Sequence, residues 1–168
     1  MNSWLIKYKA STINSVGRTI GPSLAALIVD CTNQSDENWL VIARNLIQAE
    51  KLKKEIEFFS DNKYPVDLFP EWETLPYDKF SPHRSIISQR LKVIALTQEL
   101  SKRIIIVTPP ALLNRLPPIE YVKSQTLILK KSQYLDYKKF INRLIESGYT
   151  SVTQVEDYAE YTKRGSLI

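Results

Sequence analysis

A parallel α/β sheet flanked by helices is the fold class that the apolar patterns predict for the middle of the chain. Short continuous apolar runs, typical of buried strands, alternate with segments whose apolar residues recur every three or four positions, as on one face of a helix. These two patterns alternate three times between residues 39 and 113. Because parallel strands need crossover connections, which are usually helices, the alternation predicts a parallel sheet with helices on its faces.

The three predicted strands are 39–43, 66–69 and 104–107. The first and third are continuous apolar runs, as expected for strands buried on both faces, and the second is a shorter candidate. Upstream of them, the apolar run over 24–29 predicts a helix that packs on the sheet.

Helices are predicted between and after these strands. The helix after the first strand has one buried stripe, whose members are Leu46, Ala49, Leu52, Ile56 and Phe59. The next helix is predicted to begin at Ser81-Pro82, an N-cap followed by a proline, and to run to Leu100. Thr108-Pro109 repeats this arrangement and begins a short helix.

A smaller unit is predicted beyond Pro117-Pro118, since consecutive prolines cannot continue a helix. We therefore divide the chain into an α/β domain over 1–117 and a small α+β domain over 118–168. About fifty residues of this kind would be marginal alone and would lean on the larger domain. The expected elements of the smaller domain are a strand over 126–129, a helix over 137–145 ended by Gly148, and extended pieces over 152–155 and 158–163.

The composition of the 168 residues excludes several classes of protein. No apolar run approaches the roughly 18 residues needed to span a bilayer, so we expect no membrane segment. The start of the chain lacks a basic segment followed by a long apolar one, and a single cysteine fits a reducing compartment, so we expect a cytoplasmic protein. One cysteine and one histidine cannot form a thiolate–imidazole zinc cluster, and we expect neither a metal nor a cofactor.

The formal charge of +5 favours anionic partners, but the basic residues are spread evenly. Residues 1–117 hold fifteen Lys/Arg against twelve Asp/Glu, and residues 118–168 hold eight against six. Without a basic tail or cluster, a solvated surface of mixed charge explains these numbers better than a nucleic-acid site. We expect at most a weak contact with DNA.

The turn before the helix at residue 23 is the first candidate site. A nucleoside triphosphate site needs a glycine-rich turn, a lysine for the β- and γ-phosphates and a hydroxyl for magnesium. If Gly21 is the loop glycine and Ser23 stands next to the lysine position, Leu24 replaces the lysine and Ala25 the hydroxyl. Phosphoryl transfer would then lack its main electrostatic stabilisation. The same residues also fit an ordinary turn before a helix, whose backbone amides could still hold an anion.

Two reactive side chains and one acidic loop are further candidates. His83 has no nucleophile beside it, so we expect a surface or capping role, and Cys31 is expected to be a partly buried thiol. The loop over 71–78 should follow the carboxyl end of a strand, the usual ligand side of an α/β sheet. Its Trp72 and Tyr77 could stack on a base, but its acidity opposes phosphates, so a packed structural loop is the stronger interpretation.

Two long motifs resemble the N-terminal region of bacterial transcription-repair coupling factors (Mfd). The first is the run over 71–83, followed by Ile87-Ser88-x-Arg90-Leu91. The second, at the separation expected in that family, comprises Gly148-Tyr149, Val152, Gln154-Val155, Glu160-Tyr161 and Arg164-Gly165. Both motifs occur in the correct order, and the resemblance covers nearly the whole chain.

In that family this region is similar to the damage-recognition protein UvrB, an ATPase-like α/β domain with a smaller inserted domain that docks UvrA. The resemblance implies a degenerate P-loop or helicase-like domain that has lost nucleotide binding, and a short loop where UvrB has a longer segment that clamps DNA. It also implies that Arg164 matches the family's UvrA-contact position, with Lys163 and Glu160 as neighbours. Thr150, Thr153 and Ala159 depart from the family's usual residues, which affects the details of docking.

The function implied by the resemblance is a non-catalytic recruitment module that binds UvrA and brings nucleotide excision repair to stalled RNA polymerase. The RNA-polymerase-binding domain and the translocase motor are expected outside these 168 residues, so we expect a fragment of a larger protein. Two other classes stay open: a divergent ATP-binding enzyme, and a nucleic-acid-binding module that uses Trp72 and Tyr77.

Overall fold

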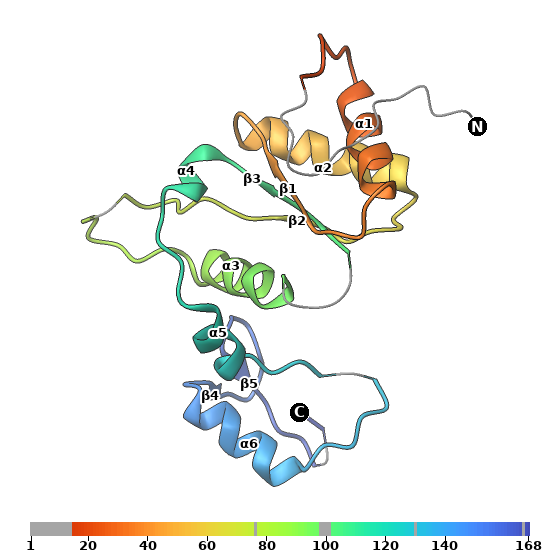
Figure 1. Ribbon diagram of the computed structural model, residues 1–168. Coiled ribbons are helices and arrows are strands. Elements are labelled where there is room, and N and C mark those ends of the chain that lie inside the picture. The colour runs from red at the N-terminus through yellow and green to blue at the C-terminus, as the bar shows by residue number, and fades with distance from the viewer. Residues whose placement is uncertain (1–14, 76, 98–101, 130, 166) are drawn as a thin grey trace.

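A three-stranded parallel sheet forms the centre of the larger part of the molecule (Figure 1). The computed structural model describes residues 15–75, 77–97, 102–129, 131–165 and 167–168. Strands β1 (Trp39–Ile42) and β2 (Val66–Leu68) pair in parallel with the central strand, β3 (Ile104–Val107). The predicted parallel α/β class and the three predicted strands are confirmed.

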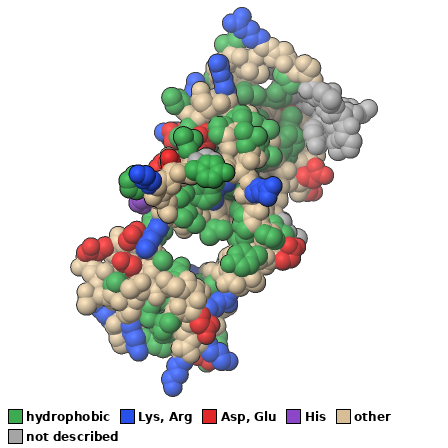
Figure 2. Space-filling view, turned by 90° about the vertical axis from the view of Figure 1, so that its left-hand side faces the viewer, with side chains coloured by type: hydrophobic (Ala, Val, Ile, Leu, Met, Phe, Trp, Pro, Cys, Tyr) green, Lys and Arg blue, Asp and Glu red, His purple; other side chains and the backbone are tan. Residues whose placement is uncertain are grey.

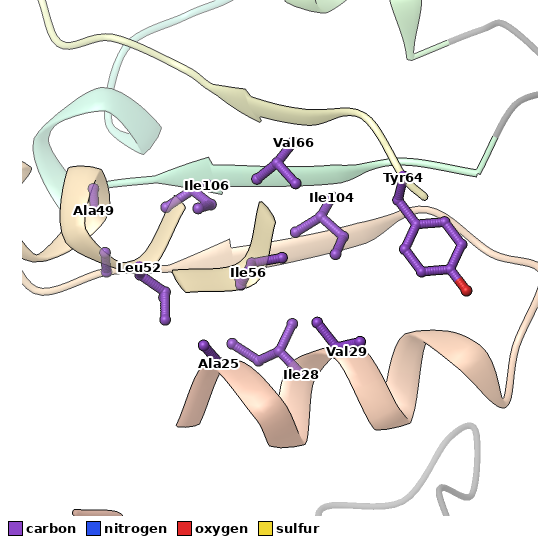
Figure 3. Close-up of a cluster of buried hydrophobic side chains, with 11 residues drawn as sticks. Ala25, Ile28, Val29, Ala49, Leu52, Ile56, Tyr64, Val66, Ile104 and Ile106 are labelled. Carbon is purple, nitrogen blue, oxygen red and sulfur yellow. The ribbon is translucent and has the colours of Figure 1, made fainter. Parts of the chain in front are cut away.

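Helices α1 (Ser23–Asn33) and α2 (Leu46–Ser60) cover one face of this sheet. Their apolar side chains meet those of the strands in a first core (Figure 3) that includes Ala25, Ile28, Val29, Ala49, Leu52, Ile56, Val66, Ile104 and Ile106. The predicted stripe of α2 is wrong at its two ends. Leu46 is 44% exposed and Phe59 is 41% exposed, because they lie in the first and last turns, outside the part of α2 that packs in this core.

The opposite face of the sheet is covered by α3 (Arg84–Leu96) and α4 (Pro109–Leu112), and α5 (Ile119–Gln125) packs against α3. A second core forms there from Phe69, Val93, Ile94, Ala95, Val107, Ala111 and Val122. These helices pack against the β2–β3 side and leave much of β1 uncovered. Leu40 and Ile42 are 57% and 59% exposed, so the prediction that this strand is buried on both faces is wrong.

The start of α3 also differs from the prediction. The helix begins at Arg84, and the N-cap is His83, whose Nδ1 accepts the Ser85 N–H; the predicted cap at Ser81 is therefore wrong. The imidazole takes this role because it can satisfy a free amide of the first turn. The predicted capping role of His83 is confirmed. Leu100, placed in the same helix by the prediction, lies outside the described residues.

The smaller part of the molecule contains α6 (Tyr137–Glu146) and two short parallel strands, β4 (Thr150–Ser151) and β5 (Glu160–Tyr161). The predicted helix is confirmed, and Gly148 ends it with a left-handed φ of +82°. The Gly148 N–H donates to Ile145 O and the Tyr149 N–H donates to Leu144 O, which is a Schellman motif.

The segment between the two parts was predicted less well. Residues 126–129 form no strand, and the preceding residues form α5, a helix that the patterns did not indicate. Pro118 is the N-cap residue of α5, and its carbonyl oxygen accepts the Val122 N–H, so this proline marks the start of a helix. Val122 of α5 is buried in the core that α3 builds. The division after residue 117 stays a prediction.

Candidate functional sites

The turn before α1 is closed by its own side chains. Gly21 has a left-handed φ of +59°, which glycine adopts without strain. The Ser23 hydroxyl accepts the Ile20 N–H at 3.0 Å and donates to the Ile20 carbonyl oxygen at 2.8 Å. The hydroxyl is thus engaged within the turn.

The two positions that a phosphate loop would fill with lysine and threonine face the protein interior. Ala25 is completely buried, and Leu24 is partly buried and packs against the first core. A cavity of about 180 Å³ beside them is lined by Gly21, Leu24, Lys51 and Glu55, among others. Lys51 Nζ already lies 3.8 Å from Glu55 Oε1, so the cavity offers a triphosphate one ammonium group that a carboxylate neutralises.

Cys31 and His83 each have defined surroundings, and the His83 Nδ1 lies 2.7 Å from Ser85 Oγ at the start of α3. Cys31 is half-buried, as predicted, and burial, together with the neighbouring Asp30 carboxylate, raises the pKa of its thiol. A raised pKa disfavours the thiolate, which is the nucleophilic form.

Among the described residues, no three His, Cys, Asp or Glu side chains gather as metal ligands. None of the described helices is both long and apolar enough to cross a membrane.

The three predicted docking residues lie close together in sequence but have different contacts. In β5, Glu160 Oε2 accepts the N–H groups of Glu156 at 2.9 Å and Asp157 at 3.0 Å, which fixes the loop before the strand. Lys163 Nζ lies 5.3 Å from the centroid of the Tyr137 ring on α6, within cation–π range.

Arg164 is the docking candidate with a free charge. Its backbone N–H and carbonyl exchange hydrogen bonds of 3.0 Å with Leu167. The side chain is exposed, and within the part of the chain that the structure describes its guanidinium makes no hydrogen bond or ion pair. The hydroxyl of Tyr137 donates to the carbonyl of the next residue, Gly165, at 3.1 Å, and ties this segment to α6.

The smaller part of the molecule also contains a cavity of about 390 Å³, which no sequence pattern indicated. Its walls come from α6, from β5 and from the segment after α5. They are mostly apolar and include Leu127, Leu129, Phe140, Leu144, Val155 and Tyr161, with Arg143 and Glu160 as charged members.

Comparison with known proteins identifies relatives over almost the whole chain, although no family model matches it. A transcription-repair-coupling factor of Escherichia coli K12 is 32% identical over 165 residues, which cover 98% of the chain and 14% of the relative. The factor of Haemophilus influenzae is 34% identical over 153 residues, 91% of the chain and 13% of the relative. A Staphylococcus aureus USA300 factor is 28% identical over 161 residues, again 13% of its length.

The chain is a homologue of the N-terminal region of transcription-repair coupling factors. The predicted resemblance is therefore confirmed. Since the chain spans about one seventh of the length of these factors, their activity as whole proteins does not transfer directly to it.

Arg90 fixes the base of the 71–83 motif, which is part of the resemblance to coupling factors. The sequence did not predict this contact. Arg90 is 3% exposed, and its guanidinium carbon lies 4.2 Å from the ring centroids of both Phe69 and Trp72. Its Nη1 donates to the Pro70 carbonyl oxygen at 2.6 Å. Burial lowers the pKa of Arg90, although arginine stays charged in proteins. Because Trp72 stacks on this cation, one face of its indole is already occupied.

The other anchor of this loop is an acidic side chain. Thr108, at the N-cap of α4, donates its hydroxyl to Glu71 Oε1 and makes no capping bond. The predicted start of α4 at Pro109 is confirmed. The Thr108 hydroxyl, however, binds Glu71 of the 71–83 motif and does not cap the helix. The base of the loop is thus packed, as predicted, whereas its tip is exposed.

Proposed function

We propose that this chain is a non-catalytic recruitment module, which binds UvrA within a transcription-repair coupling factor and so brings nucleotide excision repair to stalled RNA polymerase. Three observations support the proposal: the relationship to coupling factors, the turn before α1, and the free charge of Arg164. Any contact with RNA polymerase would be made by other parts of such a factor.

The observation that carries the non-catalytic part of the proposal is the burial of Ala25 and Leu24. A nucleotide hydrolase needs an ammonium group and a metal-binding hydroxyl at these positions, because they stabilise the charge that develops on the transferred phosphoryl group. Here Ala25 belongs to the hydrophobic core and Leu24 packs against it. The α/β part would then serve as a scaffold.

The partner-binding part of the proposal rests on the chemistry of Arg164. An exposed guanidinium without a partner in the described chain can donate two parallel hydrogen bonds to a carboxylate of another protein, a geometry that lysine cannot match. The neighbouring Lys163 and Glu160 already have partners within the chain. Lys163 lies over the Tyr137 ring, and Glu160 accepts two backbone N–H groups. We therefore assign to Arg164 the largest share of UvrA binding among these three residues.

A calorimetric titration of the chain with purified UvrA tests this function. We expect Arg164→Ala to weaken binding by about 2–4 kcal/mol, since its carboxylate partner would stay buried without a counter-charge. The melting temperature should not change, because the exposed guanidinium makes no hydrogen bond or ion pair with the residues that the structure describes. Arg44→Ala is the matched control: it removes an identical exposed charge from the loop between β1 and α2, far along the chain, and should leave the affinity unchanged.

The two competing functions give different results in the same preparation. An ATP-binding enzyme would gain thermal stability from Mg·ATP, whereas the recruitment module should gain none. A nucleic-acid-binding module would bind short DNA with a steep salt dependence. An affinity for UvrA that Arg164→Ala leaves unchanged would remove Arg164 from the docking site.

A further inference from the structure

The loop between β2 and α3 presents apolar side chains to solvent. Leu75 is 75% exposed, Phe80 is 81% exposed and Tyr77 is completely exposed. We call these three residues the apolar tip. In Figure 1 the loop projects beyond the sheet and the helices. Single exposed apolar residues are common on protein surfaces, but three within six residues on one projecting loop are typical of an interaction site.

Leu75 and Tyr77 of the apolar tip lie in a turn that is closed by hydrogen bonds. The Leu75 N–H donates to Asp78 Oδ2 at 2.6 Å, and the Asp78 N–H donates back to the Leu75 carbonyl oxygen at 3.1 Å. Between them Tyr77 has a φ of +74°, a left-handed conformation that is strained for a bulky residue. The base is fixed by Arg90 and Glu71, as described above. A loop that is ordered before it binds loses little conformational entropy on binding.

Arg84, the first residue of α3, joins the end of this loop to residues 157–158, which precede the predicted docking residues Glu160, Lys163 and Arg164. Arg84 Nη1 donates to the Tyr158 carbonyl oxygen at 3.3 Å and lies 3.9 Å from Asp157 Oδ2. Tyr158 and Val155 are 46% and 49% exposed, so the segment that Arg84 contacts also presents apolar side chains to solvent. Figure 2 views the molecule from the side on which the loop projects, with apolar side chains over the upper part and acidic side chains along the upper rim of the lower part.

We infer that the UvrA-docking surface extends from residues 155–164 across Arg84 to the apolar tip, and this inference rests on the proposed function. Aromatic and aliphatic side chains are the usual anchors of protein–protein interfaces when they enter a pocket of the partner. The exposed charges of these segments are of both signs: Glu73, Asp78, Glu156 and Asp157 are acidic, and Lys79, Arg84, Lys163 and Arg164 are basic. Such a surface lacks the basic excess that binds a phosphate backbone, whereas mixed charges around apolar anchors are typical of the rim of a protein–protein interface.

The test is a calorimetric titration with UvrA of two tip variants and one control variant of the whole chain. We expect Phe80→Ala to raise Kd at least about fivefold, as loss of an interface anchor does. Phe58→Ala is the matched control, since this phenylalanine on α2 is 78% exposed but lies outside the proposed surface, and it should leave Kd within about twofold. Tyr77→Gly removes the ring while accepting the positive φ, and should weaken binding as Phe80→Ala does.

Three results would overturn the inference, and they separate it from the proposed function. If Arg164→Ala weakens binding but Phe80→Ala and Tyr77→Gly do not, UvrA docks on residues 155–164 alone and the recruitment function stands. If the unsubstituted chain does not bind UvrA, both proposals fail. If the tip variants lose affinity for a labelled single-stranded oligonucleotide and keep their affinity for UvrA, the tip is a nucleic-acid contact.

Discussion

The α/β part and the part after α5 bury their side chains to very different extents. In the α/β part, Ile56, Ile104 and Ile106 are completely inaccessible to solvent, and two cores occupy the two faces of the sheet. Among the described residues beyond 125, Tyr161 is the buried hydrophobic residue, and α6 buries no residue fully.

The smaller part compensates with local hydrogen bonds. Asp136 caps α6, Gly148 ends it in a Schellman motif, and Glu160 closes the loop before β5. Its contacts with the α/β part and α5 include the Arg84 bridge and the hydrogen bond of Arg143 to the Ser124 carbonyl oxygen. Figure 2 shows an opening between the two parts.

The two parts are therefore stabilised differently: the α/β part by buried apolar area and the smaller part by hydrogen bonds. Burial of apolar area stabilises the α/β part as a unit, whereas hydrogen bonds in water contribute little net free energy each. We therefore expect the smaller part to open locally well before the sheet unfolds.

Ile106→Ala should have the largest effect on stability. The residue lies on the central strand at the first core and is completely buried, so the truncation leaves a cavity. We expect a loss of about 2–5 kcal/mol in the free energy of unfolding, measured by urea denaturation. Ile47→Ala on α2 is the control: its side chain is 80% exposed, and the change should stay within about 0.5 kcal/mol. A small loss for Ile106→Ala would mean that the sheet is not the stable unit.

The second prediction concerns the end of α6. Gly148→Ala places a side chain at a φ of +82°, where no neighbouring atom lies within 4 Å of the new Cβ, so the cost comes from the backbone alone. We expect about 1–2 kcal/mol, measured as faster amide exchange in α6. Gly17→Ala is the control, since Gly17 also has open space but no positive φ. Equal exchange in the two variants would contradict the assigned Schellman motif.

Sequence patterns predicted the elements whose periodicity is set by burial. The three strands and the buried middle of α2 follow from apolar spacing, because their environment is the core itself. The exposed face of β1 escaped prediction, since the run 39–42 is apolar whether or not a helix covers it. The strand expected over 126–129 failed for a related reason: β propensity forms a strand only where a neighbouring strand pairs with it.

The features of the candidate sites also differ in whether the sequence alone reveals them. The loss of the phosphate-contacting side chains can be read directly from Leu24 and Ala25. The contacts of Arg90 and Arg84 cannot, because they join residues 18 to 74 positions apart, and no local pattern records such a pair. The motif over 71–83 was recognised from the sequence, but its division into a packed base and an exposed tip required the structure.

The smallest expected effect comes from removing a helix N-cap, which can be compared between α2 and α6. Asn45 Oδ1 caps α2 by accepting the Gln48 N–H at 2.9 Å, and Asp136 Oδ1 caps α6 by accepting the N–H groups of Lys138 and Lys139. Removal of either cap should cost about 1 kcal/mol locally.

The two cap variants should differ in where that cost is measured. Because α2 is bound to the core, Asn45→Ala should lower the urea midpoint of the whole protein. Asp136→Ala should leave the midpoint of the sheet unchanged and increase amide exchange in residues 137–146, because α6 opens without the sheet. Equal shifts of one common midpoint would mean that both parts unfold together. In that case the smaller part would depend on the α/β scaffold for its order as well as its position.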